Sequence, residues 1–362
     1  MTKYPLLLAP LKIGRLALLN RIVMPPMVIY RAETDGRVTQ EHLEHYRSCA
    51  GPGLMIVEGT AVMPGGRING RQLGIFDDSH IQGLSQLAKI IHAGRGVAGI
   101  QIHHAGALAF KEVGGRRIAE LATSLIRLSW QQFATSGLRR IRAAFRAAAR
   151  RAVEAGFDII EIHGAHGYLF SQFLSPLKNW RIDRYGGKIE NRRRLLLEVY
   201  QDVHFEVAGK AMATARIGVA DGHRGGLTLA DGLSTAAALE NEGARLLDIS
   251  SGSGTPASVK PEGSPYSGRL HLARAAKQVV SIPIIGGGGI RHPDLAEKSL
   301  QDGMADLIYV GRGILADPGW ARKTIEGKPE SIVPCQECST CFHHSDSDKC
   351  PARKKLSRAG FR

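Results

Sequence analysis

Short apolar runs rich in Val, Ile and Leu alternate with longer amphipathic segments along this chain of 362 residues. The apolar runs predict buried strands, and the segments between them, with apolar residues at every third or fourth position, predict helices. We expect strands at residues 21–27, 54–60, 97–104, 158–164, 213–219, 246–252, 282–288 and 306–312. We expect helices at residues 40–50, 81–94, 137–156, 191–207, 229–243, 271–280 and 294–303.

This alternation is typical of parallel βαβ units. Eight such strands predict an α/β protein of the (β/α)8 TIM-barrel type, and a doubly wound open sheet is the alternative. We expect the barrel to occupy residues 1–330 and a cysteine-containing tail to occupy residues 331–362. Because barrel active sites form at the carboxyl ends of the strands, residues at those ends are the candidates for chemistry.

The charge balance is basic, with 48 Lys and Arg against 33 Asp and Glu and a net charge of +15. Such a charge raises nucleic acid or an anionic membrane as a partner. However, the arginines between residues 139 and 150 recur at helical spacing opposite Ile141 and Phe145, which predicts an amphipathic helix with a solvated basic face. No aromatic residues lie between them to stack on bases. We therefore expect no nucleic-acid and no membrane partner.

Two further features of the composition concern location and metal. No segment approaches the roughly 20 apolar residues of a membrane span, and the N-terminus has no cleavage-site pattern, so we expect a cytoplasmic protein. Cys49 stands alone, whereas Cys335, Cys338, Cys341 and Cys350 lie within sixteen residues. In a reducing compartment this cluster favours a metal site over disulfides, and zinc suits four sulfur ligands.

Glycine-rich segments follow the last two predicted strands, at residues 286–289 (GGGG) and 311–313 (GRG). Glycine lets several backbone N–H groups point at one anion, and Arg312 adds a forked cationic donor. In a barrel, phosphate groups bind at this position. The two segments therefore predict a phosphate site, with a tight strand-to-helix turn as the alternative.

Several strings of residues resemble one known family. They are NRIVMPPM, GIQIHHAG, HGAHGYLFSQFLSP, NWRIDRYGGKIENRRRLLLEV, ARIGVADG and DLIYVGRGILADP. Together they resemble the old yellow enzyme family of FMN-dependent ene-reductases over residues 5–325, and HGAHGYL with its RYGG and ENR continuation is highly specific to that family. The segment 108–136 fits the family pattern poorly.

The resemblance implies an FMN across the mouth of the barrel. Pro25, Pro26 and Met27 would lie beside its isoalloxazine ring. Gly59 would allow close approach, and Gln101 would bind the pyrimidine edge. Ordinary packing, or for Gln101 the satisfaction of buried backbone groups, is the alternative for these residues.

The remaining cofactor residues implied by the resemblance are Arg216, Gly288, Gly311 and Arg312. Arg216 would lie near flavin N1, and the other three would hold the phosphate. Val28 stands where branches of the family carry cysteine or threonine, which implies a reduced flavin that is less stabilised.

The family reaction explains three residues at one strand end, His163, His166 and Tyr168. The resemblance implies an NAD(P)H-dependent enzyme that reduces activated C=C bonds of α,β-unsaturated carbonyl or nitro compounds by hydride transfer from FMN N5. Both histidines can donate to one substrate oxygen, and Tyr168 is suited to give the proton. A metal half-site is the alternative for the histidines, but we expect Glu161 to point to the other side of its strand, so no carboxylate completes it.

Three other residues are candidates for the substrate pocket. Tyr30 resembles a tyrosine that one branch of the family uses there. His103 and His104 follow Gln101, and one of the two is a candidate to line the pocket.

The cysteine tail resembles, in position only, the four cysteines of the 2,4-dienoyl-CoA reductase branch, which bind an iron–sulfur cluster. Zinc, an iron–sulfur cluster and a tail without metal therefore all stay open. Two other functions stay open as well: a flavin-dependent dehydrogenase or demethylase on the same barrel, and a nucleic-acid-binding protein on an inactive barrel. The partners we expect are the alkene and NAD(P)H, and a homo-oligomer is not excluded.

Overall fold

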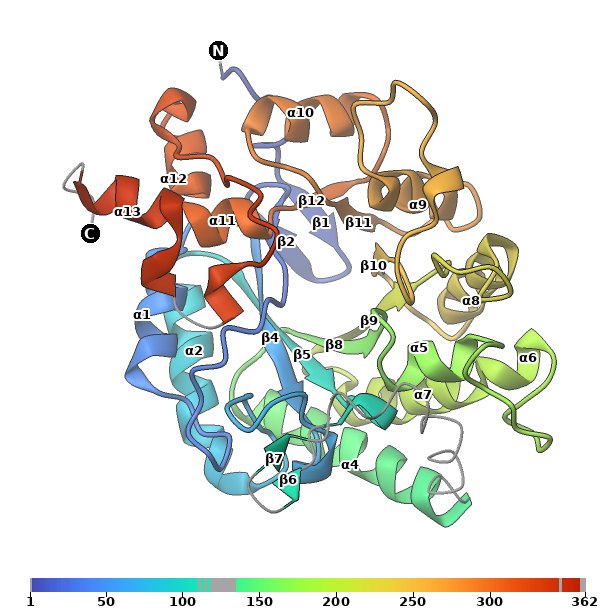
Figure 1. The fold of residues 1–362 in the computed structure, drawn as a ribbon. Coiled ribbons are helices and arrows are strands. Elements are labelled where there is room, and N and C mark those ends of the chain that lie inside the picture. The colour runs from blue at the N-terminus through green and yellow to red at the C-terminus, as the bar shows by residue number, and fades with distance from the viewer. Residues whose placement is uncertain (1, 110–111, 114–115, 118–134, 345–346, 359–362) are drawn as a thin grey trace.

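Eight parallel strands close into a barrel in this computed structural model, which describes residues 2–109, 112–113, 116–117, 135–344 and 347–358 (Figure 1). The strands follow one another around the barrel in chain order, and the last pairs with the first through Ile308 and Ile22. The predicted (β/α)8 barrel is therefore confirmed, and the open-sheet alternative is wrong. The barrel strands are β3 (Ile22–Met24), β4 (Leu54–Ala61), β5 (Val97–His103), β8 (Ile159–Gly164), β9 (Met212–Gly218), β10 (Leu247–Ser250), β11 (Ile284–Gly287) and β12 (Leu307–Tyr309).

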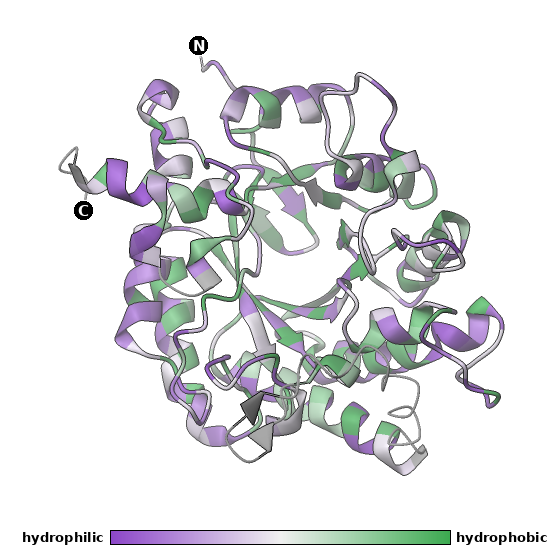
Figure 2. Cartoon of the chain, in the orientation of Figure 1, coloured by the Kyte–Doolittle hydropathy of each residue, from purple (hydrophilic) through white to green (hydrophobic). Residues whose placement is uncertain are grey.

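Burial on both faces explains the continuous apolar runs of the barrel strands. Every residue of β4 and of β8 is buried, because one face of each strand packs inside the barrel and the other packs against the helices. Figure 2 shows apolar strands at the centre and polar outer helix faces. Strand β3 is shorter than predicted because Pro25 and Pro26 lack the N–H group that a sheet ladder needs.

The outer layer consists of helices between the strands, as predicted. Local signals set where they begin: the side chains of Thr228 and Ser267 accept backbone N–H groups at the starts of α8 and α9, and Pro293 occupies the first turn of α10. The helices are α1 (Gln40–Ser48), α2 (Ile81–Ala93), α4 (Thr135–Glu154), α5 (Leu169–Leu174), α6 (Ile189–Arg192), α7 (Arg194–Val207), α8 (Leu229–Asn241), α9 (Gly268–Ala276), α10 (Pro293–Gln301), α11 (Arg312–Ala316), α12 (Trp320–Ile325) and α13 (Pro351–Arg358).

The basic face of α4 differs from the sequence-based expectation. Arg142 forms a two-pronged ion pair with Asp202 of α7 and also contacts Glu198, and Arg146 pairs with Glu206. Two arginines of the face are therefore paired with acidic side chains of the neighbouring helix, and their side chains stay partly exposed, 33% for Arg142 and 64% for Arg146. This pairing is a further argument against a polyanion-binding surface.

Shorter elements complete the chain. Strands β1 (Leu11–Ile13) and β2 (Leu16–Leu18) form an antiparallel hairpin, as do β6 (Glu112–Val113) and β7 (Arg116–Arg117). Most of the segment 108–136, which fits the family pattern poorly, lies outside the described residues. No helix in the described ranges combines the length and the apolar character needed to cross a membrane. The cytoplasmic location stays a prediction.

The C-terminal segment packs against the outside of the barrel. Ala352 and Leu356 of α13 are buried, and the Arg353 guanidinium donates to the carbonyl of Leu315 at the end of α11. The boundary at residue 330 between barrel and tail stays a prediction.

Candidate active site

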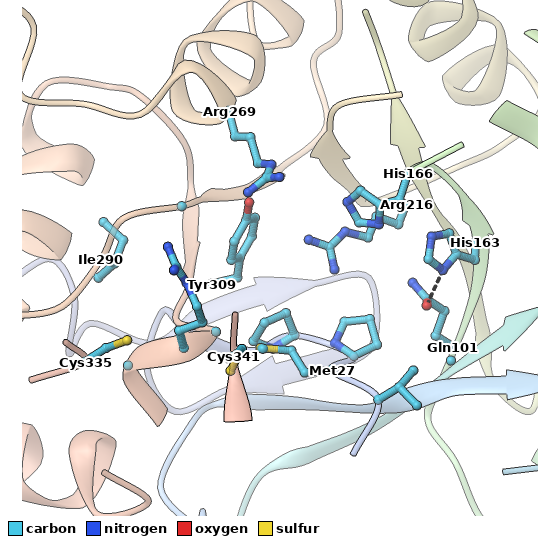
Figure 3. A pocket seen from close by; sticks show the side chains of 18 of the residues that line it. Met27, Gln101, His163, His166, Arg216, Arg269, Ile290, Tyr309, Cys335 and Cys341 are labelled. Carbon is cyan, nitrogen blue, oxygen red and sulfur yellow. Dashed lines mark hydrogen bonds between the residues drawn. The ribbon is translucent and has the colours of Figure 1, made fainter. Parts of the chain in front are cut away.

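A cavity of about 430 Å³ opens at the carboxyl ends of the barrel strands (Figure 3). Its volume lies in the range of small-molecule sites. All the flavin, substrate and catalytic residues expected from the sequence line it, although they come from seven of the eight strands or the loops that follow them. They are Pro25, Pro26, Met27, Tyr30, Gly59, Gln101, His163, His166, Tyr168, Arg216, Gly288, Gly311 and Arg312.

The end of strand β8 brings His163, His166 and Tyr168 together. His166 and Gly167 both adopt the left-handed conformation, with φ of 60° and 77°, so the chain turns sharply after the strand. The ring centroid of His163 lies 5.2 Å from that of His166 and 5.2 Å from that of Tyr168. The turn therefore places two imidazoles and a phenol in one cluster.

Burial sets the protonation of this cluster. It lowers the pKa of His163 and of His166 well below the ordinary value, so both rings are neutral near pH 7 and each carries one N–H. Nε2 of His166 is hydrogen-bonded to Oγ of Ser250 at 2.7 Å, whereas Nε2 of His163 has no hydrogen-bond partner among the described residues. Burial also raises the pKa of Tyr168 to about 12, so its phenol keeps its proton.

Gln101 connects His163 to a buried carboxyl. Oε1 of Gln101 lies 2.5 Å from Nδ1 of His163, and Nε2 of Gln101 lies 2.8 Å from Oε1 of Glu161. The expectation that Glu161 points to the other side of its strand was therefore wrong. Side chains alternate along a strand, so residues 161 and 163, two positions apart, share the inner face.

Arg216 of β9 is the cation at the centre of the barrel end. Its Nε lies 3.3 Å from Oδ2 of Asp248, and its guanidinium lies over the ring of Tyr309, 5.0 Å from the centroid. Burial raises the pKa of Glu161 to about 8 and that of Asp248 to about 6, and the negative charge of Asp248 adds to the shift of Glu161. The arginine favours ionisation of both carboxyls, but burial outweighs it.

Side chains approach two glycines closely in the predicted phosphate segments, which we call the glycine cradles. Gly288 has a φ of +109°, and a Cβ there would lie 2.8 Å from Oγ of Ser267. A Cβ on Gly311 would lie 2.8 Å from Sδ of Met27. Arg312 lies beside them, 3.7 Å from a carboxylate oxygen of Glu337, a residue of the cysteine tail.

The four tail cysteines surround one small pocket, which Arg312 also lines. Cys335 and Cys341 line the main cavity as well. Within the described residues no three potential ligand side chains are arranged to hold a single metal ion. Cys49 is buried elsewhere, under α1, and burial raises the pKa of its thiol to about 11.

Several residues of the site were not assigned from the sequence. His103 lines the cavity, 4.7 Å from the Tyr168 ring centroid, whereas His104, left open beside it, is not a lining residue. Tyr309 and Arg269 also line the cavity. Period-two alternation from Gly311 could have placed Tyr309 inside, but no sequence signal points to Arg269.

A closed parallel barrel with its polar residues, glycine cradles and neutral histidines gathered at one end defines the class: a (β/α)8-barrel enzyme. Residues 6–331 match the model of the NADH:flavin oxidoreductase / NADH oxidase family. The chain belongs to this family, in agreement with the resemblance to old yellow enzymes, and is an FMN-dependent NAD(P)H oxidoreductase.

Individual relatives agree. The chain is 42% identical over 309 residues to an NADPH dehydrogenase from Halalkalibacterium halodurans, covering 84% of this chain and 89% of that one. It is 37% identical over 348 residues to an NADH oxidase from Thermoanaerobacter brockii, covering 94% of this chain but 54% of the relative. The chain thus spans about half the length of that oxidase.

Several solved structures share the fold at 25% identity or more. A 2-naphthoyl-CoA reductase complex superposes with a TM-score of 0.82 and 27% identity, covering 94% of this chain and 55% of that chain. A morphinone reductase variant in complex with tetrahydroNAD superposes with a TM-score of 0.74 and 26% identity, covering 90% and 91%.

The residues present fit an FMN. A Cβ at either glycine would lie 2.8 Å from a neighbouring side chain, and Gly288 has a φ that favours glycine, as expected where a phosphate approaches the backbone closely. Arg216 places a cation, and Gln101 an amide, on the cavity wall. Val28 lines the same wall, so the family's cysteine or threonine position is occupied here by a side chain without a hydrogen-bonding group.

Proposed function

We propose that this protein is an NAD(P)H-dependent ene-reductase that reduces the activated C=C bond of α,β-unsaturated carbonyl or nitro compounds. One observation carries the proposal: His163, His166 and Tyr168 line one cavity together with Arg216 and the glycine cradles. The names of the 2-naphthoyl-CoA and morphinone reductases support reduction over oxidation of the organic substrate.

The chain's own residues divide the chemistry between them. Gln101, Arg216, Arg312 and the glycine cradles would hold the FMN, which would supply hydride for the β-carbon of the alkene. His163 and His166 bind the carbonyl or nitro oxygen and stabilise the negative charge that develops on it. Because both rings are neutral, this stabilisation comes from donated hydrogen bonds and not from a full positive charge.

Tyr168 completes the reaction by giving its proton to the α-carbon. Its phenol is half-buried and keeps its proton near pH 7, because burial holds its pKa near 12. The same burial excludes water from the neighbouring imidazoles, which strengthens their hydrogen bonds to the developing charge.

Separate half-reactions test the proposed function. The FMN-loaded protein is reduced without oxygen by NADH or NADPH and then mixed with enones, enals, nitroalkenes or maleimides, while flavin absorbance is followed. We expect rapid reoxidation by at least one alkene class, with formation of the saturated product. Reduction by the coenzyme without reoxidation by any of these alkenes would reject the proposal.

We further propose that Cys335, Cys338, Cys341 and Cys350 bind an iron–sulfur cluster. All four line one pocket, which suits a cluster whose thiolates bind different irons. Zinc held by the same four sulfur atoms is the alternative.

Metal analysis tests this proposal. We expect iron and acid-labile sulfide, but no stoichiometric zinc, in protein purified without oxygen, because the proposed cluster contains both iron and sulfide. Cys338→Ser and Cys350→Ser should lose most of the iron, whereas the control Cys49→Ala should keep it. Stoichiometric zinc, or no metal at all, would contradict the cluster.

A further inference from the structure

Three buried side chains on neighbouring strands form a continuous hydrogen-bonded row, Glu161, Gln101 and His163. Glu161 and Gln101 are fully buried, and His163 is 6% exposed. The row ends at Nε2 of His163, which has no partner among the described residues and belongs to a ring that lines the cavity. The positions of the hydrogens in this row therefore decide whether Nε2 of His163 can donate a hydrogen bond to a substrate.

The charges around Glu161 favour a neutral carboxyl. Arg216 of β9 and Asp248 of β10 act on it electrostatically, and Gln101 of β5 donates to it, whereas His103 of β5 lies against the ring of His163. Arg216 is within ion-pair distance of Asp248 and not of Glu161. The carboxyls of Glu161 and Asp248 thus share one guanidinium in this part of the described barrel interior. Asp248 contacts the guanidinium directly, so Glu161 is the carboxyl that retains a proton. The raised pKa of Glu161, about 8, agrees with this charge count.

The proton on Glu161 determines the orientation of the Gln101 amide. An ionised Glu161 only accepts, so the amide N–H points to it, Oε1 accepts from Nδ1–H of His163, and Nε2 of the neutral ring carries no hydrogen. The structure shows this orientation of the amide. A protonated Glu161 instead donates to Oε1 of a reversed amide, whose N–H then points to Nδ1 and leaves the hydrogen on Nε2.

The reversed arrangement also satisfies the buried hydroxyl of a neutral Glu161. Oε2 of Glu161 has no partner among the described residues, so a hydrogen placed there would point at nothing. When the protonated Oε1 of Glu161 donates to the amide oxygen of Gln101, the hydroxyl hydrogen has an acceptor and only lone pairs remain without a partner. A buried acceptor without a partner is less unfavourable than a buried donor without one. Gln101 keeps a second N–H and a second lone pair for the pyrimidine edge of the cofactor.

We propose that Glu161 is a positioning residue whose proton, relayed through the Gln101 amide, places the imidazole hydrogen of His163 on Nε2 and so makes His163 a donor to the substrate oxygen. The relay itself follows from the row of hydrogen bonds, and its use in substrate binding rests on the proposed function. Loss of the Glu161 proton in alkaline solution moves the hydrogen to Nδ1 and removes one donor from the oxyanion site.

Nitrogen NMR of the FMN-loaded full-length protein tests the relay, because the shifts of the ring nitrogens identify the tautomer. The His163 signals are assigned by their loss in His163→Asn. In the wild type we expect Nε2–H on the acid side of the Glu161 pKa and Nδ1–H on the alkaline side. In Glu161→Gln we expect a tautomer that does not change between pH 6.5 and 9.5, since the titrating group is gone.

Glu58→Gln is the matched control. Glu58 is an equally buried glutamate on strand β4, but it accepts from the backbone of Ile29 and does not contact Gln101. This variant should keep the pH-dependent tautomer. A His163 tautomer that is constant with pH in the wild type, or one that still changes in Glu161→Gln, would overturn the relay.

Binding of a phenolate that is ionised over the whole range gives a functional readout. Its affinity for the wild type should fall about tenfold or more as the pH rises through 8, and should stay level in Glu161→Gln. The NMR measurement of the His163 tautomer uses no alkene, so its result does not depend on the proposed function. A pH-dependent tautomer in a protein that reduces no alkene would therefore reject the proposed function and retain the relay.

Discussion

At the scale of single residues, burial decides the chemistry of this site. His163, His166 and Tyr168 are ordinary titratable side chains in water. Inside the barrel end both imidazoles are neutral and the phenol keeps its proton, because the low-dielectric surroundings disfavour their charged forms. The sequence identifies these residues, but their hydrogens depend on neighbours from other strands, such as Gln101 and Ser250.

Replacing Tyr168 with Phe removes the proposed proton donor and keeps the ring. We expect reoxidation by an alkene to slow by about 10²-fold or more, because general-acid catalysis typically contributes 10²–10⁴-fold. Reduction by NAD(P)H should stay within a few fold of the wild type, since that half-reaction needs no proton from Tyr168. Stopped-flow absorbance measures both rates separately. An equal fall in both half-reactions would show that Tyr168 acts on cofactor binding instead.

At the scale of elements, helices α4 and α7 pair basic side chains with acidic ones. Helical periodicity predicts which arginines share a face, and the structure confirms that Ile141 and Phe145 lie on the buried side. The periodicity does not show that α7 presents carboxylates to the other side. Helices α4 and α7 are separated by strand β8 in the chain and meet only because both cover neighbouring strands.

Arg142→Ala tests the strength of this pairing. Arg142 contacts both Asp202 and Glu198 and is about one-third exposed, so we expect the free energy of unfolding to fall by about 0.5–1 kcal/mol. Arg139→Ala is the matched control, because Arg139 is exposed and makes no ion pair with a described residue. Urea denaturation at low and at high salt measures both variants. A loss for Arg142→Ala that salt does not reduce would point to packing of its stem and not to charge.

At the scale of the whole molecule, closure of the barrel creates a site from residues far apart in the chain. Met27 and Gly311 are nearly 300 positions apart in the sequence, yet a Cβ on Gly311 would collide with the Met27 side chain. Pairing of β12 with β3 brings these segments together. The same closure buries histidines in the interior, which makes the stability of the fold sensitive to acid.

We expect the FMN-saturated protein to lose stability between pH 7 and pH 5. Besides His271, burial lowers the pKa of five histidines in the described residues, among them His104 to about 4, from an ordinary value of 6.5. An unfolded chain protonates them below pH 6.5 while the folded chain does not, so each contributes a loss of about 2 kcal/mol at pH 5. The five are His45, His103, His104, His163 and His166.

The buried carboxyls act in the opposite direction. Glu161 and Asp248 have raised pKa values, so they favour the folded state in acid and lose that contribution as the pH rises through about 8 and about 6. Five histidines outweigh two carboxyls, and Glu161→Gln should make the loss between pH 7 and pH 5 steeper. Denaturant titrations at several pH values measure both proteins. Equal or greater stability at pH 5 would contradict this balance.

The sequence by itself determined the barrel, the family and the flavin, substrate and catalytic candidates, all of which line the cavity. Strand and helix periods are local, and motifs such as HGAHGYL lie within one strand and its turn, so neither requires knowledge of the fold. Tertiary structure alone decided that Glu161 bonds Gln101, that Glu337 contacts Arg312, and that Arg142 and Arg146 of α4 meet acids of α7. The reason is physical: burial, and with it protonation and hydrogen-bond direction, depends on contacts between segments that only barrel closure brings together.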